Sequence, residues 1–376
     1  MAAPEVIIGT NEEYILGYQL SPQQDGTVSL RQTFADHSHS GSVRQVAVSG
    51  KYLVSGASDE TLRVFNLRTR AEVGIIMEHQ GTITSVAFHK SGYLFSAAQD
   101  GHICIYNRRK WQCEKTLKGH RGGVLSLAVH PSGKLALSVG QDRTLRTWDL
   151  IKGRKAYITN LKTVGDSVHW SPDGSQYVVV KGSCVDLYKV AVGQVVHSVD
   201  FKETVTSLIF LMDDIIAVGG EGKNICIYDL TTKVELTQWA AHTMRIKSLR
   251  VIPRDTADSE DLWLASASSD GKIKVWRLEL LSLSSLPTLL GEIDTTCRII
   301  CMDVHLPPPP RTHTPDSHND SEEEESDNVH TADHTYGASP KKLKQRKRKK
   351  KLSRMVTQGG ESVDDLKPKK KKIKFV

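Results

Sequence analysis

Residues 138–150 have the sequence SVGQDRTLRTWDL, and five other segments of the chain repeat its plan. Each copy has small residues, then a polar turn, then alternating apolar residues that end in an aromatic side chain. The other copies are SGASDETLRVFNL from Ser55, SAAQDGHICIYNR from Ser96, VVVKGSCVDLYKV from Val178, VGGEGKNICIYDL from Val218 and SASSDGKIKVWRL from Ser266. The regular spacing of these copies predicts a protein built from repeats of about forty residues.

Each repeat is predicted to form four short β-strands. A further alternating run precedes each copy, at Val43–Val48, Ile83–Phe88, Val124–Val129, Ser167–Trp170, Val205–Phe210 and Ile246–Val251. Period-two alternation, β-branched residues and turns of Gly, Asp, Asn and Ser favour strands over helices. The last repeat is longer, which we assign to a loop at Pro253–Asp261 between its first two strands.

The two ends of the chain supply one more set of strands. Three N-terminal runs, Val6–Gly9, Tyr14–Leu20 and Val28–Phe34, precede the first repeat. After Leu289–Ile293, the outer strand of the sixth repeat, Arg298–His305 looks like one more inner strand. Sharing one blade between the chain ends would protect strand edges. We therefore expect an all-β fold, a seven-bladed β-propeller over residues 1–306.

The repeats resemble WD40 repeats, and Trp148-Asp149 is the dipeptide after which that family is named. The resemblance implies a buried chain of hydrogen bonds from Asp through His and a hydroxyl to the indole N–H. Two complete tetrads match it: His120, Ser138, Asp142 and Trp148, and His242, Ser266, Asp270 and Trp276. Two partial sets are His39, Ser55 and Asp59, and His79, Ser96 and Asp100. In these sets Phe65 cannot donate the last bond and Tyr106 donates from a different position, while the repeats ending at Tyr188 and Tyr228 lack the His and the Asp.

The repeated His–Asp pairs are interpreted as architecture rather than as catalytic groups. A pair at the same place in four repeats serves the fold, and the sequence has no phosphate loop, nucleophile elbow or HExxH motif. The six cysteines form no CxxC pair, and Cys104 and Cys226 lie in matching apolar runs that predict burial. We expect no enzyme activity, no cofactor and no metal site.

The formal charge of +7 lies almost entirely in the last 70 of the 376 residues. Residues 1–306 contain 33 basic and 32 acidic groups, so the predicted propeller is nearly neutral. Residues 311–333 have a net charge of −7 and residues 334–376 have +13. Because both segments are poor in apolar residues, we predict a disordered acidic spacer at 307–333 and a disordered lysine-rich tail at 334–376.

The tail contains two basic clusters, which favour nuclear or nucleolar localisation or RNA contact. Their basic residues are Lys341, Lys342, Lys344, Arg346, Lys347, Arg348, Lys349, Lys350 and Lys351, then Lys367, Lys369, Lys370, Lys371, Lys372 and Lys374. A merely solvated tail and a membrane-surface segment are the alternatives, the latter disfavoured because no lipidation signal ends the chain. No apolar run is long enough for a membrane span, and the N-terminus lacks the features of a secretory signal.

Ser321, followed by Glu322–Glu325, is a candidate phosphorylation site, with a plain acidic spacer as the equal alternative.

A closer resemblance is to the WD40 proteins that interact with p21-activated kinases, a family with a yeast ribosome-assembly relative. The stretches that match are HPSGKLALSVG from His130, LRTW from Leu145, WSP from Trp170, QYVV from Gln176 and ASSDG from Ala267. The resemblance implies a nucleolar scaffold that docks assembly factors of the large ribosomal subunit precursor (pre-60S), with weak pre-rRNA contact through the tail. It also implies a negative regulator that binds the regulatory region of a p21-activated kinase and blocks its activation by GTPases. We expect a monomer within such complexes and no membrane partner.

A ubiquitin-ligase substrate adaptor, or another generic signalling scaffold, is the alternative function. An adaptor would need an added motif such as an F-box, and the sequence shows none. For any scaffold, the expected binding face carries the turns between second and third strands and the loops between blades. Charged residues predicted on it are Glu60, Arg121, Arg143, Lys223, Arg245 and Lys272.

Overall fold

A computed structural model describes residues 3–90, 92–253 and 261–307 of the chain, all within one compact unit. The acidic spacer beyond Pro307, the lysine-rich tail, both basic clusters and Ser321 lie outside the described residues. What was predicted for these segments stays a prediction.

The described residues form 28 β-strands in seven antiparallel sheets of four strands, each of which is one blade. Blade 1 contains β4 (Val43–Ser49), β5 (Tyr52–Ala57), β6 (Leu62–Asn66) and β7 (Ala71–Ile76); blade 2 contains β8 (Ile83–His89), β9 (Tyr93–Ala98), β10 (His102–Asn107) and β11 (Gln112–Lys118). Blade 3 contains β12 (Val124–Val129), β13 (Leu135–Gly140), β14 (Thr144–Asp149) and β15 (Arg154–Asn160); blade 4 contains β16 (Ser167–Trp170), β17 (Gln176–Lys181), β18 (Cys184–Lys189) and β19 (Val195–Asp200). Blade 5 contains β20 (Val205–Phe210), β21 (Ile215–Gly220), β22 (Asn224–Asp229) and β23 (Val234–Ala240); blade 6 contains β24 (Ile246–Ile252), β25 (Asp261–Ser268), β26 (Lys272–Glu279) and β27 (Thr288–Asp294). Blade 7 contains β28 (Ile299–His305), β1 (Glu5–Thr10), β2 (Ile15–Pro22) and β3 (Val28–Asp36). A short 3₁₀ turn, η1 (Leu280–Ser282), follows β26, and no helix in the described ranges is long and apolar enough to cross a membrane.

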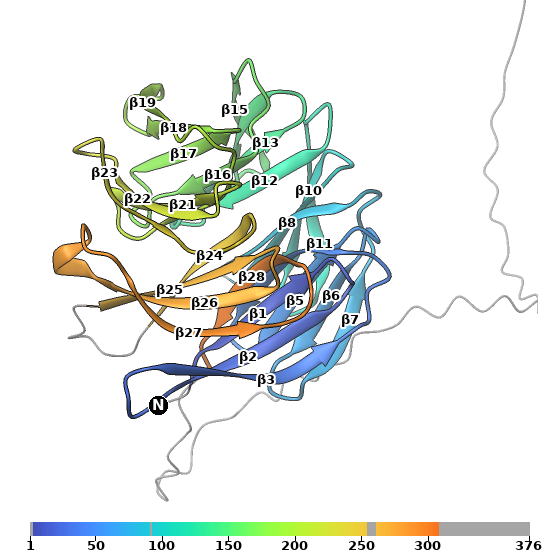
Figure 1. Ribbon diagram of the computed structural model, residues 1–376. Coiled ribbons are helices and arrows are strands. Elements are labelled where there is room, and N and C mark those ends of the chain that lie inside the picture. The colour runs from blue at the N-terminus through green and yellow to red at the C-terminus, as the bar shows by residue number, and fades with distance from the viewer. Residues whose placement is uncertain (1–2, 91, 254–260, 308–376) are drawn as a thin grey trace, which may run out of the picture. The chain divides into compact units, whose positions relative to one another are not determined.

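Blade 7 closes the ring by joining the two ends of the sequence. Its inner strand β28 pairs with β1, with Ile7 opposite Asp303 and Gly9 opposite Cys301. Figure 1 shows the orange β28 among blue strands from the start of the chain. Because β28 also contacts β24 and β4, the seven inner strands form a closed circle. The seven-bladed propeller and its shared blade are therefore confirmed.

The core is divided into seven hydrophobic clusters, one in each interface between neighbouring blades. Between blades 7 and 1, for example, Ile7 and Ile15 pack with Val43 and Leu53, and all four are fully buried. Strand burial follows position in the blade: all six residues of β5 are buried, whereas the outer strand β15 is mostly exposed. Continuous side-to-side packing of this kind gives a dense, rigid ring.

One face of the ring carries the loops that enter the inner strands together with the turns between second and third strands. In most blades a backbone hydrogen bond joins the turn to the loop of the same blade: Ser58 N donates to Ser42 O at 3.0 Å, and Gln141 N donates to Gly123 O at 2.9 Å. We call this face the turn face. The candidate binding residues lie on it.

Candidate interaction surface and central channel

The tetrad of blade 3 is assembled beneath the turn face. The indole Nε1 of Trp148 donates to Ser138 Oγ at 2.8 Å, and that hydroxyl lies 2.7 Å from His120 Nε2. His120 Nδ1 lies 2.9 Å from Asp142 Oδ1. The Asp142 carboxylate also accepts from Arg121 N at 3.0 Å, so the tetrad ties the turn to the loop.

The tetrad of blade 6 repeats this geometry in full, and the partial sets of blades 1 and 2 repeat it up to the aromatic residue. In blade 6, Trp276 Nε1 donates to Ser266 Oγ at 2.9 Å, and His242 bridges Ser266 and Asp270. The same His contacts occur in blade 1 at 2.7 and 2.8 Å (His39, Ser55 and Asp59) and in blade 2 at 2.6 and 2.8 Å (His79, Ser96 and Asp100). Phe65 makes no such bond, while the Tyr106 hydroxyl lies 3.3 Å from Ser96 Oγ.

Burial keeps His120 neutral, and hydrogen bonds keep Asp142 charged, within the blade 3 tetrad. Burial lowers the pKa of His120, and the hydrogen bond and charge of Asp142 oppose this only in part. Burial would raise the pKa of Asp142, but bonds from Arg121 N–H, the Thr144 hydroxyl and His120 hold it well below its usual range. A neutral imidazole then donates from Nδ1 to the carboxylate and accepts at Nε2 from the serine hydroxyl. The His120 side chain is 0% exposed, so no substrate can reach it.

Blade 4 contains a different buried polar group in place of a tetrad. Asp186 on β18 accepts from the Ser198 hydroxyl at 2.6 Å and forms an ion pair with Lys181. Asp186 is only 4% exposed. The one weak sign of it in the sequence is a carboxylate inside an alternating apolar strand. Tyr188, the aromatic residue of this repeat, stacks on Tyr177 with ring centroids 4.9 Å apart.

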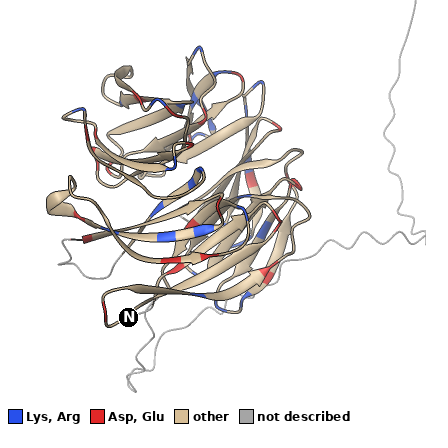
Figure 2. Cartoon of the chain, in the orientation of Figure 1, with Lys and Arg blue, Asp and Glu red and all other residues tan. Residues whose placement is uncertain are grey.

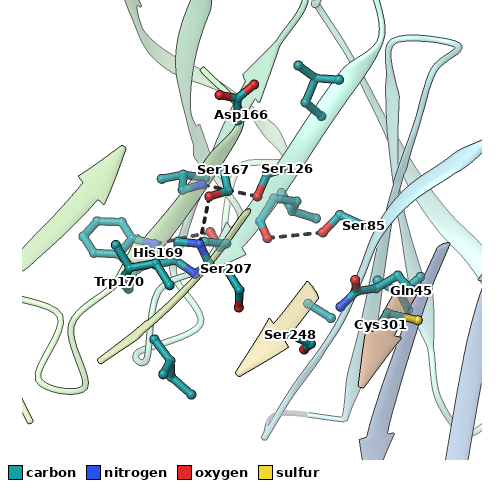
Figure 3. A pocket seen from close by; sticks show the side chains of 18 of the residues that line it. Gln45, Ser85, Ser126, Asp166, Ser167, His169, Trp170, Ser207, Ser248 and Cys301 are labelled. Carbon is teal, nitrogen blue, oxygen red and sulfur yellow. Dashed lines mark hydrogen bonds between the residues drawn. The ribbon is translucent and has the colours of Figure 1, made fainter. Parts of the chain in front are cut away.

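A polar channel runs between the inner strands, with a cavity of about 670 Å³. Five serines occupy the same place on five inner strands, and Gln45 and Cys301 take that place on the other two; the serines are Ser85, Ser126, Ser167, Ser207 and Ser248. Figure 3 shows these side chains around the cavity. Ser207 Oγ accepts from Leu249 N at 3.0 Å, and Ser126 Oγ accepts from Val168 N at 3.3 Å. Each bond joins neighbouring blades, a role that the sequence reasoning missed although the serine recurs in register.

Asp303 links three blades within the channel. One carboxylate oxygen lies 3.3 Å from Arg250 Nε of blade 6, and the other accepts from Val48 N of blade 1 at 2.8 Å. Burial raises the pKa of Asp303, although Arg250 and the backbone bonds oppose this. Burial and the nearby charge of Arg250 lower the pKa of His169 to about 4. The contacts of Asp303 join blades 6, 7 and 1, where the two ends of the sequence meet.

The six charged residues predicted on the turn face are spread around it. Glu60 lies on blade 1, Arg121 and Arg143 on blade 3, and Lys223 on blade 5, all exposed. The two on blade 6 have acidic partners: Lys272 Nζ lies 3.4 Å from Glu292, and Arg245 Nη1 lies 3.8 Å from Glu221. In Figure 2, basic and acidic residues are mixed over the propeller.

The cysteines are free thiols, and Cys104 and Cys226 are buried as their apolar runs predict. Burial raises the pKa of each of these two thiols to about 12. Among the described residues, no three His, Cys, Asp or Glu side chains are grouped to hold a metal ion.

Comparison with known families gives a match to the WD domain, G-beta repeat, over residues 28–66, 71–107, 111–149 and 233–277. These matched segments include the repeats of blades 1, 2, 3 and 6, the four that contain a His–Asp pair. The region between them contains blade 4 and most of blade 5, where the tetrad is missing.

Relatives of the chain match it over different lengths. A "p21-activated protein kinase-interacting protein 1-like" of Danio rerio is 40% identical over 303 residues, 81% of each chain. The "Shk1 kinase-binding protein 15" of Schizosaccharomyces pombe is 27% identical over 274 residues, 72% of this chain and 76% of the relative. "Protein MAK11" of Saccharomyces cerevisiae is 38% identical over 89 residues, 22% of each chain.

Proposed function

The chain belongs to the family of WD40 proteins named p21-activated protein kinase-interacting protein 1, and on this premise we propose that it is a non-enzymatic scaffold with two roles. In one role it binds the regulatory region of a p21-activated kinase and blocks activation by GTPases. In the other it acts in the nucleolus, in assembly of the large ribosomal subunit precursor and pre-rRNA processing. The observation that carries the proposal is the 40% identity to a kinase-interacting relative over 303 residues, most of the propeller.

The architecture suits a docking role. Seven packed interfaces and a closed circle of inner strands hold the loops of the turn face in fixed positions. The tetrad histidines stabilise this frame and are inaccessible to substrate: those of blades 1, 3 and 6 are 0% exposed. A rigid surface binds a partner without the entropic cost of ordering its own loops.

The kinase role is supported by the names of two relatives, one of which is called kinase-binding. We expect the full chain to bind the purified N-terminal regulatory region of a p21-activated kinase directly, measured by calorimetry. The isolated kinase domain is the control. Binding to the kinase domain alone, or to neither fragment, would contradict this part of the proposal.

The nucleolar role rests on the sequence of the tail, where nine of the eleven residues from Lys341 to Lys351 are basic. Such clusters attach proteins to nucleic acid without reading its sequence. Deleting residues 341–376 should disperse a fluorescent fusion from nucleoli, whereas retained nucleolar signal would refute this role of the tail. A pulldown scored for pre-ribosomal particles against kinase then tells which partner dominates in cells.

A further inference from the structure

A group of cations lies at one side of the channel mouth on the turn face. Lys247 is the second residue of β24 and Arg44 is the second residue of β4, while Arg245 and Arg298 directly precede β24 and β28. Because β28 lies between β24 and β4, ring closure brings these four residues onto three consecutive blades. They come from opposite ends of the sequence, so no linear motif shows them together.

The remaining inner strands have no cation at the place of Arg44 and Lys247. The equivalent residues are Thr84, Leu125, Asp166, Thr206 and Ile300. At this place on the inner strands, positive charge is therefore confined to blades 1 and 6. Asp166, the one acidic group among these residues, accepts from Gly182 N at 2.6 Å.

Little negative charge balances this group. Within the described part of the chain, Arg44, Lys247 and Arg298 form no ion pair, and Arg245 has one long contact of 3.8 Å to the exposed Glu221. The nearby Glu12 accepts from the backbone N of Arg298 at 3.0 Å. Deeper in the channel, by contrast, Arg250 is paired with Asp303 at 3.3 Å.

The cations interact unfavourably with one another. Burial lowers the pKa of the half-buried Lys247, and the charges of Arg245, Arg298 and Arg44 lower it further against the smaller opposing effect of Glu221. A rigid fold holds these like charges together, and a bound anion would reduce the repulsion between them.

We propose that this group, which we call the mouth cluster (Arg44, Arg245, Lys247 and Arg298), binds a phosphorylated segment of a partner protein. Three guanidinium groups beside one ammonium group match a phosphate dianion, because arginine forms paired hydrogen bonds to phosphate oxygens. The cluster covers one side of a single channel mouth on a nearly neutral propeller, which fits one phosphate better than the long backbone of a nucleic acid. The inference does not depend on the proposed function, since it concerns the chemistry of the ligand whichever protein supplies it.

An oriented library of phosphoserine peptides tests this inference with the full chain, so that the lysine-rich tail is the same in every arm. The R44Q/K247Q variant removes two charges from the mouth cluster. The matched R109Q/K110Q variant removes one arginine and one lysine that are exposed in the turn between β10 and β11, outside the turn face. At physiological salt we expect phosphopeptides selected by the wild type to bind R44Q/K247Q about 10-fold more weakly and R109Q/K110Q with little change.

Three outcomes would overturn the proposal. If both variants bind the phosphopeptides as tightly as the wild type does, the binding site is the tail and not the mouth cluster. Equal selection of an unphosphorylated serine library would exclude phosphate recognition. Stronger competition by a ten-nucleotide oligouridine than by phosphopeptide at the mouth cluster would identify RNA as the ligand. Because removing mutually repelling charges should not destabilise the fold, thermal unfolding of R44Q/K247Q at or above the wild-type temperature verifies that the variant is folded.

Discussion

Trp148 donates its indole N–H to Ser138 at 2.8 Å, and this bond connects the third strand of blade 3 to the buried His120. The corresponding bond exists in blade 6 and is missing from blade 1, where Phe65 has no donor. Different blades thus contain different numbers of tetrad hydrogen bonds, and packing supplies the remaining stabilisation of the blade.

Replacing His120 by alanine should destabilise the propeller. The change leaves Ser138 and Asp142 without their buried partner, at a cost of about 1–3 kcal/mol in the free energy of unfolding. Urea or thermal unfolding measures this, with His37→Ala as the control because that side chain is 51% exposed. Unchanged stability of His120→Ala would contradict the tetrad assignment.

The serine ring should contribute to stability through contacts between blades. In Ser207→Ala the backbone N–H of buried Leu249 loses its acceptor, so we expect unfolding to be easier by about 1–3 kcal/mol. Ser85→Ala is the matched control, since Ser85 is a donor at a longer distance of 3.4 Å to Leu127 O. If both variants have the same free energy of unfolding, the hydrogen bond from Leu249 N to Ser207 does not contribute the predicted stability.

Stability should decrease as the pH falls from 7 to 5. The native pKa values of His39, His120, His242 and His169 lie below the ordinary value, so the unfolded chain binds more protons below about pH 6.5. Their contribution is complete above that pH and is lost as the pH falls toward the native pKa values, about 4 for His169. Melting temperatures at pH 7 and 5 measure the decrease, which should be smaller in His169→Gln. An equal decrease in wild type and variant would show that His169 does not titrate on unfolding.

The tight turn of blade 3 should tolerate glycine. Arg143 has a φ of 57°, and glycines with φ of 81° and 80° occupy the same place in blades 2 and 6. Arg143→Gly should therefore unfold at or slightly above the wild-type temperature, while the β-branched Arg143→Val should lose about 1 kcal/mol or more. Calorimetry measures the unfolding of the two variants. A greater loss of stability in the glycine variant would contradict the argument from the positive φ of residue 143.

The sequence predicts the fold well because its information is periodic. The alternation and turns recur in six copies, and the strand left over at each end completes a seventh blade. The tetrads follow in the same way, since each member has a fixed place in the repeat.

Features that break the repeat could not be predicted. Lys181 and Asp186 take the place of a tetrad in one blade only, so no second copy marks them. The mouth cluster depends on ring closure, which places Arg44 near Arg298 although 254 positions separate them. For the charged residues of the turn face, sequence identifies the face, but only the structure shows which charges have partners.

Autophosphorylation of a purified p21-activated kinase, stimulated by a GTPase, tests whether this protein inhibits the kinase as proposed. The full chain at a concentration equal to that of the kinase should suppress the stimulated rate, while a constitutively active kinase lacking its regulatory region should be unaffected. An unchanged stimulated rate at saturating concentrations of the full chain would contradict direct inhibition.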